Sequence, residues 1–182
     1  MAQTEPTPPA TVHDPAITPL DRWIRRFGHL LSLLFLLSGG VIVFEVVARY
    51  LFNAPTIWGH ETTMFLCGVL FAYGGSYCLA GNGHIRIVLI YDRVSNRVRR
   101  RLDIAISAVG VLYGVMLSWA AWTVAERALF APWGAFRMET SGSAWNPPFP
   151  ALLKTILMLV LILMTVQYVL HLIHHIRRNP DV

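Results

Sequence analysis

The stretch that decides the fold is LLSLLFLLSGGVIVFEVVARYLF, residues 30–52, a 23-residue run that holds only two charged side chains. An α-helix rises 1.5 Å per residue, so about 20 apolar residues cross the hydrocarbon core of a bilayer. The run is too long for the apolar part of a signal peptide, and no A-x-A cleavage pattern follows it. We therefore interpret residues 30–52 as a retained membrane span.

Three further apolar runs follow, at residues 62–80, 104–125 and 151–173. Of the 182 residues, 55% are hydrophobic and only 14% are charged, whereas about 25% are charged in ordinary soluble domains. Mean hydropathy is +0.52. These patterns predict an all-α integral membrane protein, with four transmembrane helices in one membrane domain over residues 17–182. The four prolines of residues 1–16 favour a disordered tail before it.

The basic residues are divided unequally between the two sides of these spans. Eleven arginines flank one side and three basic residues the other. Cytoplasmic loops carry the excess of Lys and Arg, so both termini are predicted to be cytoplasmic and the loops at 53–61 and 128–150 to face outward. The eleven are Arg22, Arg25, Arg26, Arg86, Arg93, Arg97, Arg99, Arg100, Arg101, Arg177 and Arg178.

Two short amphipathic helices are expected in the cytoplasmic interface, one before span one and one between spans two and three. The first begins at Thr18, with Pro19 in the first helical position and Asp21 placed to complete a capping box. The second has apolar residues at helical spacing between 87 and 98, with basic residues on the other face. Its basic face should meet anionic phospholipids. The residues assigned to the lipid interface are His84, Arg86, Arg93, Arg97 and Arg100.

Few polar residues interrupt the spans, and each has more than one explanation. Glu45 and Arg49 are four residues apart, so they can pair as a structural brace or line a pathway. Glu61 opens span two, where a carboxylate favours the helix N-terminus or contacts a partner. Gln167 lies deeper in span four and should hydrogen-bond to another helix.

Small residues form rows on the spans, most clearly the GxxxG pair of Gly110 and Gly114. Small residues let membrane helices approach closely. The pair therefore indicates either packing among the four spans or contact with a second membrane subunit.

Several function classes find little support in the sequence. It has no P-loop, no HExxH motif and no plausible catalytic set, so we expect neither an enzyme nor a cofactor or metal site. Cys67 and Cys78 are too far apart on one helix for a disulfide. The basic residues follow membrane spans, which argues against nucleic acid. Four histidines near the cytoplasmic ends leave a haem-binding membrane anchor of a redox enzyme as the alternative: His29, His171, His174 and His175.

Three motifs occur in order along the chain. The first is Arg49-Tyr50-Leu51-Phe52-Asn53, followed by Trp58 and Glu61. The second is Gly83-His84-Ile85-Arg86 with Tyr91-Asp92-Arg93. The third is Glu139-Thr140-Ser141 with Ala144-Trp145-Asn146-Pro147-Pro148. Together, over residues 20–175, they resemble the DctQ-like small membrane subunit of tripartite ATP-independent periplasmic (TRAP) transporters. His60 and Val88 depart from the pattern, because the family has acids there.

The resemblance implies a non-catalytic subunit of a sodium-coupled transporter in the bacterial inner membrane. It implies two protein partners, a large elevator-type permease subunit and a periplasmic solute-binding protein, for uptake of an organic acid or similar solute. Candidate contacts with the large subunit are Glu45, Arg49, Trp58, Glu61, Gly110, Gly114 and Gln167. Candidate docking residues for the binding protein are Trp133, Arg137 and Trp145, which could equally form an aromatic belt at the headgroups.

Overall fold

The computed structural model describes residues 18–81 and 96–177, without the side chains of 96, 97 and 99. These residues form four helices: α1 (Pro19–Leu51), α2 (Gly59–Ala80), α4 (Asn96–Leu129) and α5 (Phe149–Arg177). Each is long and apolar enough to cross a membrane. The predicted all-α fold with four spans is confirmed, and the chain is a multi-pass membrane protein.

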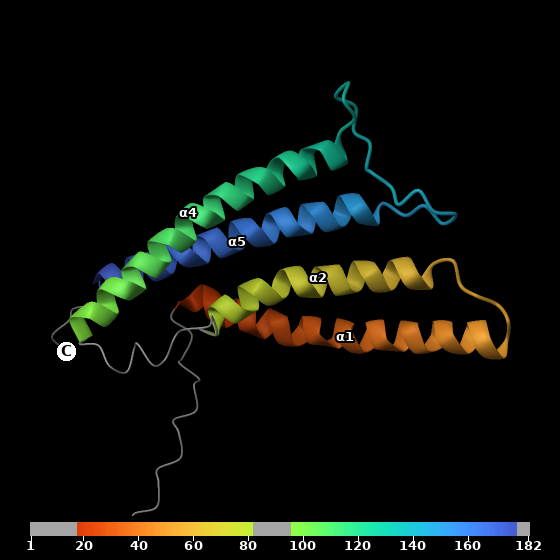
Figure 1. The fold of residues 1–182 in the computed structure, drawn as a ribbon, viewed down its shortest axis with the longest axis horizontal. Coiled ribbons are helices and arrows are strands. Elements are labelled where there is room, and N and C mark those ends of the chain that lie inside the picture. The colour runs from red at the N-terminus through yellow and green to blue at the C-terminus, as the bar shows by residue number, and fades with distance from the viewer. Residues whose placement is uncertain (1–17, 82–95, 178–182) are drawn as a thin grey trace, which may run out of the picture.

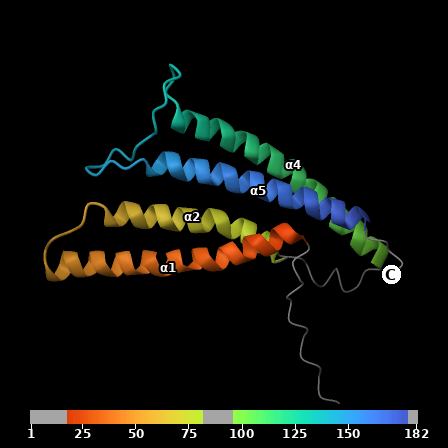
Figure 2. The ribbon, with the colours of Figure 1, turned by 180° about the vertical axis from the view of Figure 1, so that it is seen from behind.

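The helices lie side by side in the order α1, α2, α5, α4, as both ribbon views show (Figures 1 and 2). Extended contacts join α1 to α2, α2 to α5 and α5 to α4. The central pair, α2 and α5, runs in the same direction, because ring contacts join their beginnings and hydrogen bonds join their later turns. The outer pair, α1 and α4, therefore has broad surfaces that no described helix covers.

The helices extend beyond the predicted apolar runs. α1 begins at the predicted capping box, in which the Thr18 side chain accepts from the Asp21 N–H and the Asp21 side chain accepts from the Thr18 N–H. The helix then continues without a break to Leu51, so the segment expected as a separate interfacial helix is the first part of α1. Most of the second expected helix and the 1–16 tail lie outside the described residues, and α4 is already helical at Asn96. The interfacial placement of these segments stays a prediction.

Small residues determine how closely α4 approaches α5. A Cβ added at Gly110 would lie 2.4 Å from the ring of Tyr168, and one at Gly114 would lie 2.6 Å from the hydroxyl of Thr165. Real side chains do not approach so closely, so the two helices depend on glycine at both positions. Of the two explanations left open for the GxxxG pair, the structure supports packing among the chain's own helices.

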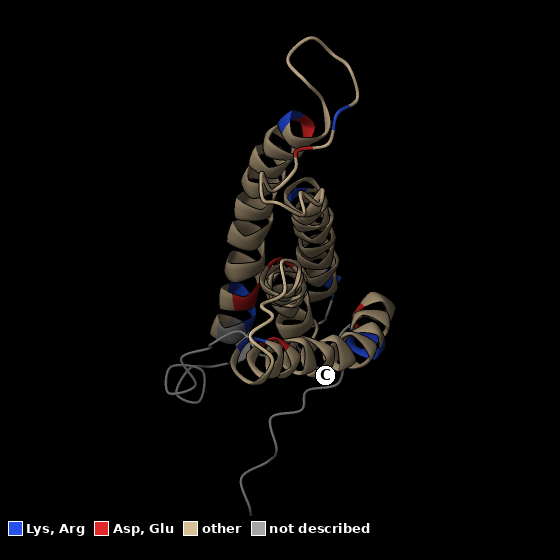
Figure 3. Cartoon of the chain, turned by 90° about the vertical axis from the view of Figure 1, so that its right-hand side faces the viewer, with Lys and Arg blue, Asp and Glu red and all other residues tan. Residues whose placement is uncertain are grey.

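Charged residues occupy little of the ribbon, which is mostly the tan of uncharged residues in Figure 3. Large apolar side chains on α1 and α4 are exposed along the spans, including Phe35, Leu36 and Trp119. Such exposure would be unfavourable in water but suits contact with lipid or with another membrane helix.

Candidate functional site

Two polar clusters occupy opposite ends of α1, and we name them for the predicted sides of the membrane. The inner cluster comprises Thr18, Asp21, Ser76, Gln167 and His171, and each of these residues is more than nine-tenths buried. The outer cluster comprises Glu45, Arg49 and Thr56, and part of it is open to the surroundings. Together they contain both acids of α1, Asp21 and Glu45.

Asp21 is the centre of the inner cluster. Its Oδ2 accepts hydrogen bonds from the N–H of Thr18 at 2.9 Å and from the hydroxyl of Thr18 at 2.6 Å. The same oxygen lies 3.0 Å from Nε2 of His171. Its Oδ1 accepts from Nε2 of Gln167 at 3.1 Å. One carboxylate therefore caps α1 and also binds two side chains of α5.

Gln167 connects this carboxylate to α2. Its Nε2 also donates to the Ser76 carbonyl at 3.3 Å, and its Oε1 accepts from the Ser76 hydroxyl at 3.0 Å. The predicted hydrogen bond from Gln167 to another helix is confirmed. A buried polar group is costly unless it is paired, and here the pairing joins α1, α2 and α5 at one end. One ring nitrogen of His171, which the haem alternative would need as a candidate ligand, is engaged with Asp21.

The sequence did not predict the contact between Asp21 and His171, because the two residues are 150 positions apart. The sequence did contain one local signal for each of the two residues. Asp21 belonged to a predicted capping box, and His171 lies four residues after Gln167, on the same face of α5. The packing of α1 on α2 and of α2 on α5 brings the first turn of α1 to these residues of α5.

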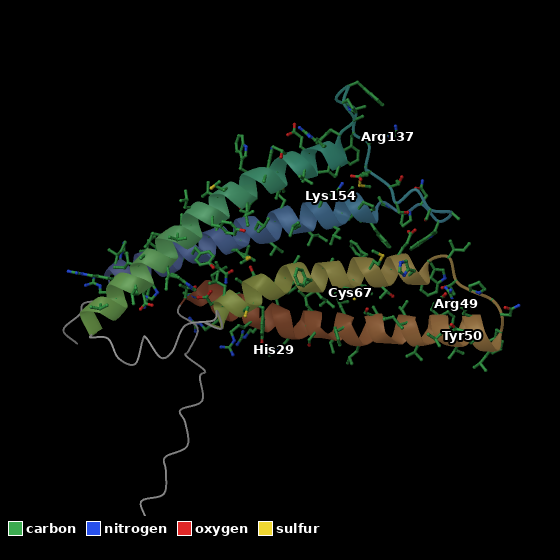
Figure 4. All side chains as sticks on the ribbon, viewed as in Figure 1. His29, Arg49, Tyr50, Cys67, Arg137 and Lys154 are labelled. Atoms are coloured by element: carbon green, nitrogen blue, oxygen red, sulfur yellow. The ribbon has the colours of Figure 1, made fainter. Side chains whose placement is uncertain are left out.

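The outer cluster contains the predicted ion pair of α1. Arg49 Nη2 lies 2.5 Å from Glu45 Oε1. The second oxygen of Glu45 accepts from the N–H of Thr56 at 3.0 Å and from the Thr56 hydroxyl. Glu45 thus fixes the connection between α1 and α2, while the Arg49 side chain stays 53% exposed. In Figure 4, Arg49 and Tyr50 lie at the end of α1 where the chain turns toward α2.

Neighbouring residues of the first motif shape this end of the chain. Asn53 has φ 52°, a left-handed conformation that asparagine tolerates better than most residues. The next N–H, that of Ala54, donates to the Ala48 carbonyl at 3.0 Å, which closes the helix end. Trp58 stacks on Phe44 with ring centroids 6.0 Å apart. The motif therefore builds the turn from α1 to α2.

Glu61 lies in the first turn of α2, as predicted. Its Oε2 is buried and has no hydrogen-bond partner among the described residues. Glu61 shares a helix face with Phe65, whose ring stacks on that of Phe149 with centroids 4.5 Å apart. This spacing directs Glu61 toward the side of α2 that faces α5. Its contact with a partner stays a prediction.

The loop between α4 and α5 presents the predicted docking residues in two different settings. Trp133 is 71% exposed, and Arg137 lies on the same part of the loop, beyond the end of α4 (Figure 4). Trp145 instead packs edge-on against Phe149 at the start of α5, with centroids 5.3 Å apart. The base of the loop is fixed by an ion pair between Lys154 and Glu139.

Most of the residues assigned to the lipid interface lie outside the part of the chain that the structure describes. His84, Arg86 and Arg93 are not described, and of Arg97 only the backbone is. Arg100 has a partner that the sequence did not predict: its guanidinium donates to the carbonyls of His175 at 3.2 Å and Ile176 at 2.6 Å. A cation at the C-terminus of a helix satisfies its last carbonyls and favours its dipole, so Arg100 joins α4 to the end of α5.

An apolar groove of about 410 Å³ lies between α4 and α5, lined in part by Trp119, Trp122 and Ile162. The hydroxyls of Ser118 and Thr165 on its wall lie 3.1 Å apart and hydrogen-bond to each other. The groove therefore offers apolar contact and no charged group.

Comparison with known protein families gives a match over residues 38–178, to the family described as "Tripartite ATP-independent periplasmic transporters, DctQ component". The matched segment is more than half of the chain and includes the later part of α1, all of α2, α4 and α5, and the outer cluster. No curated protein matches the chain significantly. The match confirms the family that the three motifs predicted.

Proposed function

The chain belongs to the DctQ family of TRAP transporter components, and we propose that it is the non-catalytic scaffold subunit of such a transporter. As a small membrane subunit it would hold a larger permease subunit in the bilayer while that subunit moves substrate. Uptake would be sodium-coupled, the solute an organic acid or similar compound, and a periplasmic binding protein would deliver it. The membrane would be the bacterial inner membrane, with both termini in the cytoplasm.

The observation that carries this proposal is that polar side chains of the spans hydrogen-bond to other helices of the same chain. Ser76 and Gln167 bond to each other, Ser118 bonds to Thr165, and Asp21 bonds to α5. A substrate pathway needs polar groups that can be released to a solute, whereas these bonds stabilise helix contacts. The arrangement therefore favours a rigid support over a conduit.

The outer cluster supplies the best site for a membrane partner. Arg49 is fixed in position by Glu45 yet remains half exposed, so it can donate further hydrogen bonds to a carboxylate of the large subunit. Trp58 and Glu61, which follow Arg49 by nine and twelve residues at the start of α2, would complete the proposed contact. Phospholipids would be bound at the opposite, cytoplasmic end, by the basic residues assigned to the lipid interface.

The 130–148 loop is the proposed docking surface for the binding protein. Trp133 and Arg137 combine exposed aromatic area with a cation, a composition that is common at interaction hot spots. Trp145 would act from the base of the loop through its contact with Phe149.

Reconstitution tests the scaffold role directly. Proteoliposomes would carry this chain alone, the large subunit alone, or both, each with and without the binding protein and a sodium gradient. We expect uptake of a labelled organic acid only when all three proteins and the gradient are present. Uptake by this chain alone would contradict the proposal. Uptake at full rate without this chain would also contradict it, because the chain would then not be required for transport.

A further inference from the structure

The first turn of α1 is bound by the same side chain that attaches it to α5. Asp21 Oδ2 accepts both bonds from Thr18 and also contacts His171 Nε2 at 3.0 Å. Asp21 Oδ1 accepts from Gln167 at 3.1 Å. The cap of α1 and its docking on α5 therefore use one carboxylate, which is fully buried.

No extended contact between the described helices duplicates this attachment. The extended helix contacts join α1 to α2 and α2 to α5, and α1 is not in extended contact with α5. The next turn of α1 is fixed to α2, where the Tyr73 hydroxyl donates to the Ile24 carbonyl at 2.8 Å. A Cβ added at Gly28 would lie 2.3 Å from the Tyr77 ring, so α1 and α2 are in close contact there too. Residues 18–21, the N-cap and first residues of α1, are therefore the segment whose position depends on α5.

We propose that the inner cluster is a latch, in which the first turn of α1 forms and docks on α5 as one event. In the closed state Asp21 is capped by Thr18 and bound by Gln167 and His171. In the open state the carboxylate leaves α5, and the capping box by itself is too weak to hold the first turn. The latch thus gives the first turn of α1 two states. In one it is helical and docked on α5, and in the other it is unwound and detached from α5. This inference does not depend on the proposed role in transport.

Hydrogen exchange of the full chain in lipid nanodiscs tests the latch. The informative variant is His171→Leu, which removes a contact on α5, and the readout is exchange at the amides of residues 21–25 on α1. Exchange at residues 121–125 of α4 provides an internal reference. The ratio of the two exchange rates corrects for any loosening of the whole protein. His174→Leu is the matched control, because His174 lies on the same helix but is exposed.

The latch predicts that His171→Leu raises the exchange of residues 21–25 roughly tenfold to a hundredfold relative to α4, the factor expected for one charge-assisted hydrogen bond. His174→Leu should leave the ratio unchanged. Thr18→Ala should raise the same ratio, and the double variant should raise it by less than the product of the two single effects. An unchanged ratio in His171→Leu, or single effects that multiply in the double variant, would overturn the proposal.

Discussion

The inner and outer clusters are both built around an acid of α1, yet they use it in opposite ways. Asp21 is fully buried, and its partners come from its own first turn and from α5. Glu45 binds Arg49, four residues along the same helix, and Thr56 in the next connection. The inner acid therefore joins distant parts of the chain, while the outer acid organises a local segment.

Because of this difference, the inner cluster stabilises the fold, while the outer cluster remains accessible to a partner protein. The inner cluster is closed, because each of its members is buried among the others. The outer cluster is saturated at Glu45 but leaves the guanidinium of Arg49 half exposed. A charge that is fixed but exposed suits recognition, whereas a charge that is buried and paired is needed for the fold once it is present.

The largest expected effect follows from removing the inner acid. Asp21→Ala leaves the Thr18 N–H and the His171 ring without their carboxylate partner in a buried site, and leaves the Gln167 amide with the Ser76 carbonyl as its acceptor. Breaking a buried pair in this way costs about 3–5 kcal/mol. The free energy of unfolding, measured by SDS titration of the protein in mixed micelles, should fall by that order.

Ser32→Ala is the matched control on the same helix. The Ser32 hydroxyl is exposed and donates only to the His29 carbonyl of its own helix, so its loss should change stability little. Equal stability for Asp21→Ala and Ser32→Ala would mean that the inner cluster does not hold the helices together.

A second comparison on α1 concerns two glycines. Gly28→Ala places a methyl group where the ring of Tyr77 already lies, whereas Gly39→Ala adds one where nothing lies within 4 Å. Overpacking costs typically 1–3 kcal/mol, so Gly28→Ala should destabilise the protein and Gly39→Ala should not. The same SDS titration measures both. If the two variants were alike, α1 would not be closely packed at its inner end.

Local patterns predicted local features well. The four spans followed from apolar run length, the start of α1 from Thr18, Pro19 and Asp21, and the outer ion pair from the i, i+4 spacing of Glu45 and Arg49. Each of these signals lies within one continuous segment of the chain and depends on helix geometry, together with the thickness of the bilayer for the spans. Such features form before the helices pack, so the sequence carries them directly.

Tertiary pairings were not predictable in the same way. Gln167 was expected to bond to some helix, but its partners on α1 and α2 depend on the order α1, α2, α5, α4. The bonds from Arg100 to the end of α5 depend on the same order. No periodicity in one sequence encodes which helices become neighbours, since every span is apolar on most of its surface.

A third prediction separates stability from assembly at the outer cluster. Glu45→Ala releases Thr56 and Arg49 together, so it should loosen the connection between α1 and α2 and lower stability less than Asp21→Ala does. Arg49→Ala leaves Glu45 bound to Thr56 and should hardly affect stability, but it should reduce co-purification with the large subunit. Arg49→Lys should retain only part of the co-purification with the large subunit, because lysine lacks the planar guanidinium group that can donate two parallel hydrogen bonds. Wild-type co-purification of Arg49→Ala would show that the exposed guanidinium has no partner there.

The smallest effect on stability is expected in the outer loop, where the proposed role lies outside the chain. Arg137→Ala removes an exposed cation and Trp145→Ala removes a ring that packs on Phe149, so the latter should shift stability slightly and the former not at all. Both should raise the concentration of loaded binding protein needed for half-maximal uptake by the reconstituted transporter, by about fivefold or more if they are hot spots. Arg127→Ala is the control, because Arg127 is an exposed arginine in the last turn of α4 outside the proposed surface. If all three variants took up solute like the wild type with normal assembly, the aromatic residues of this loop would be an interfacial belt, and recognition of the binding protein would lie in the large subunit.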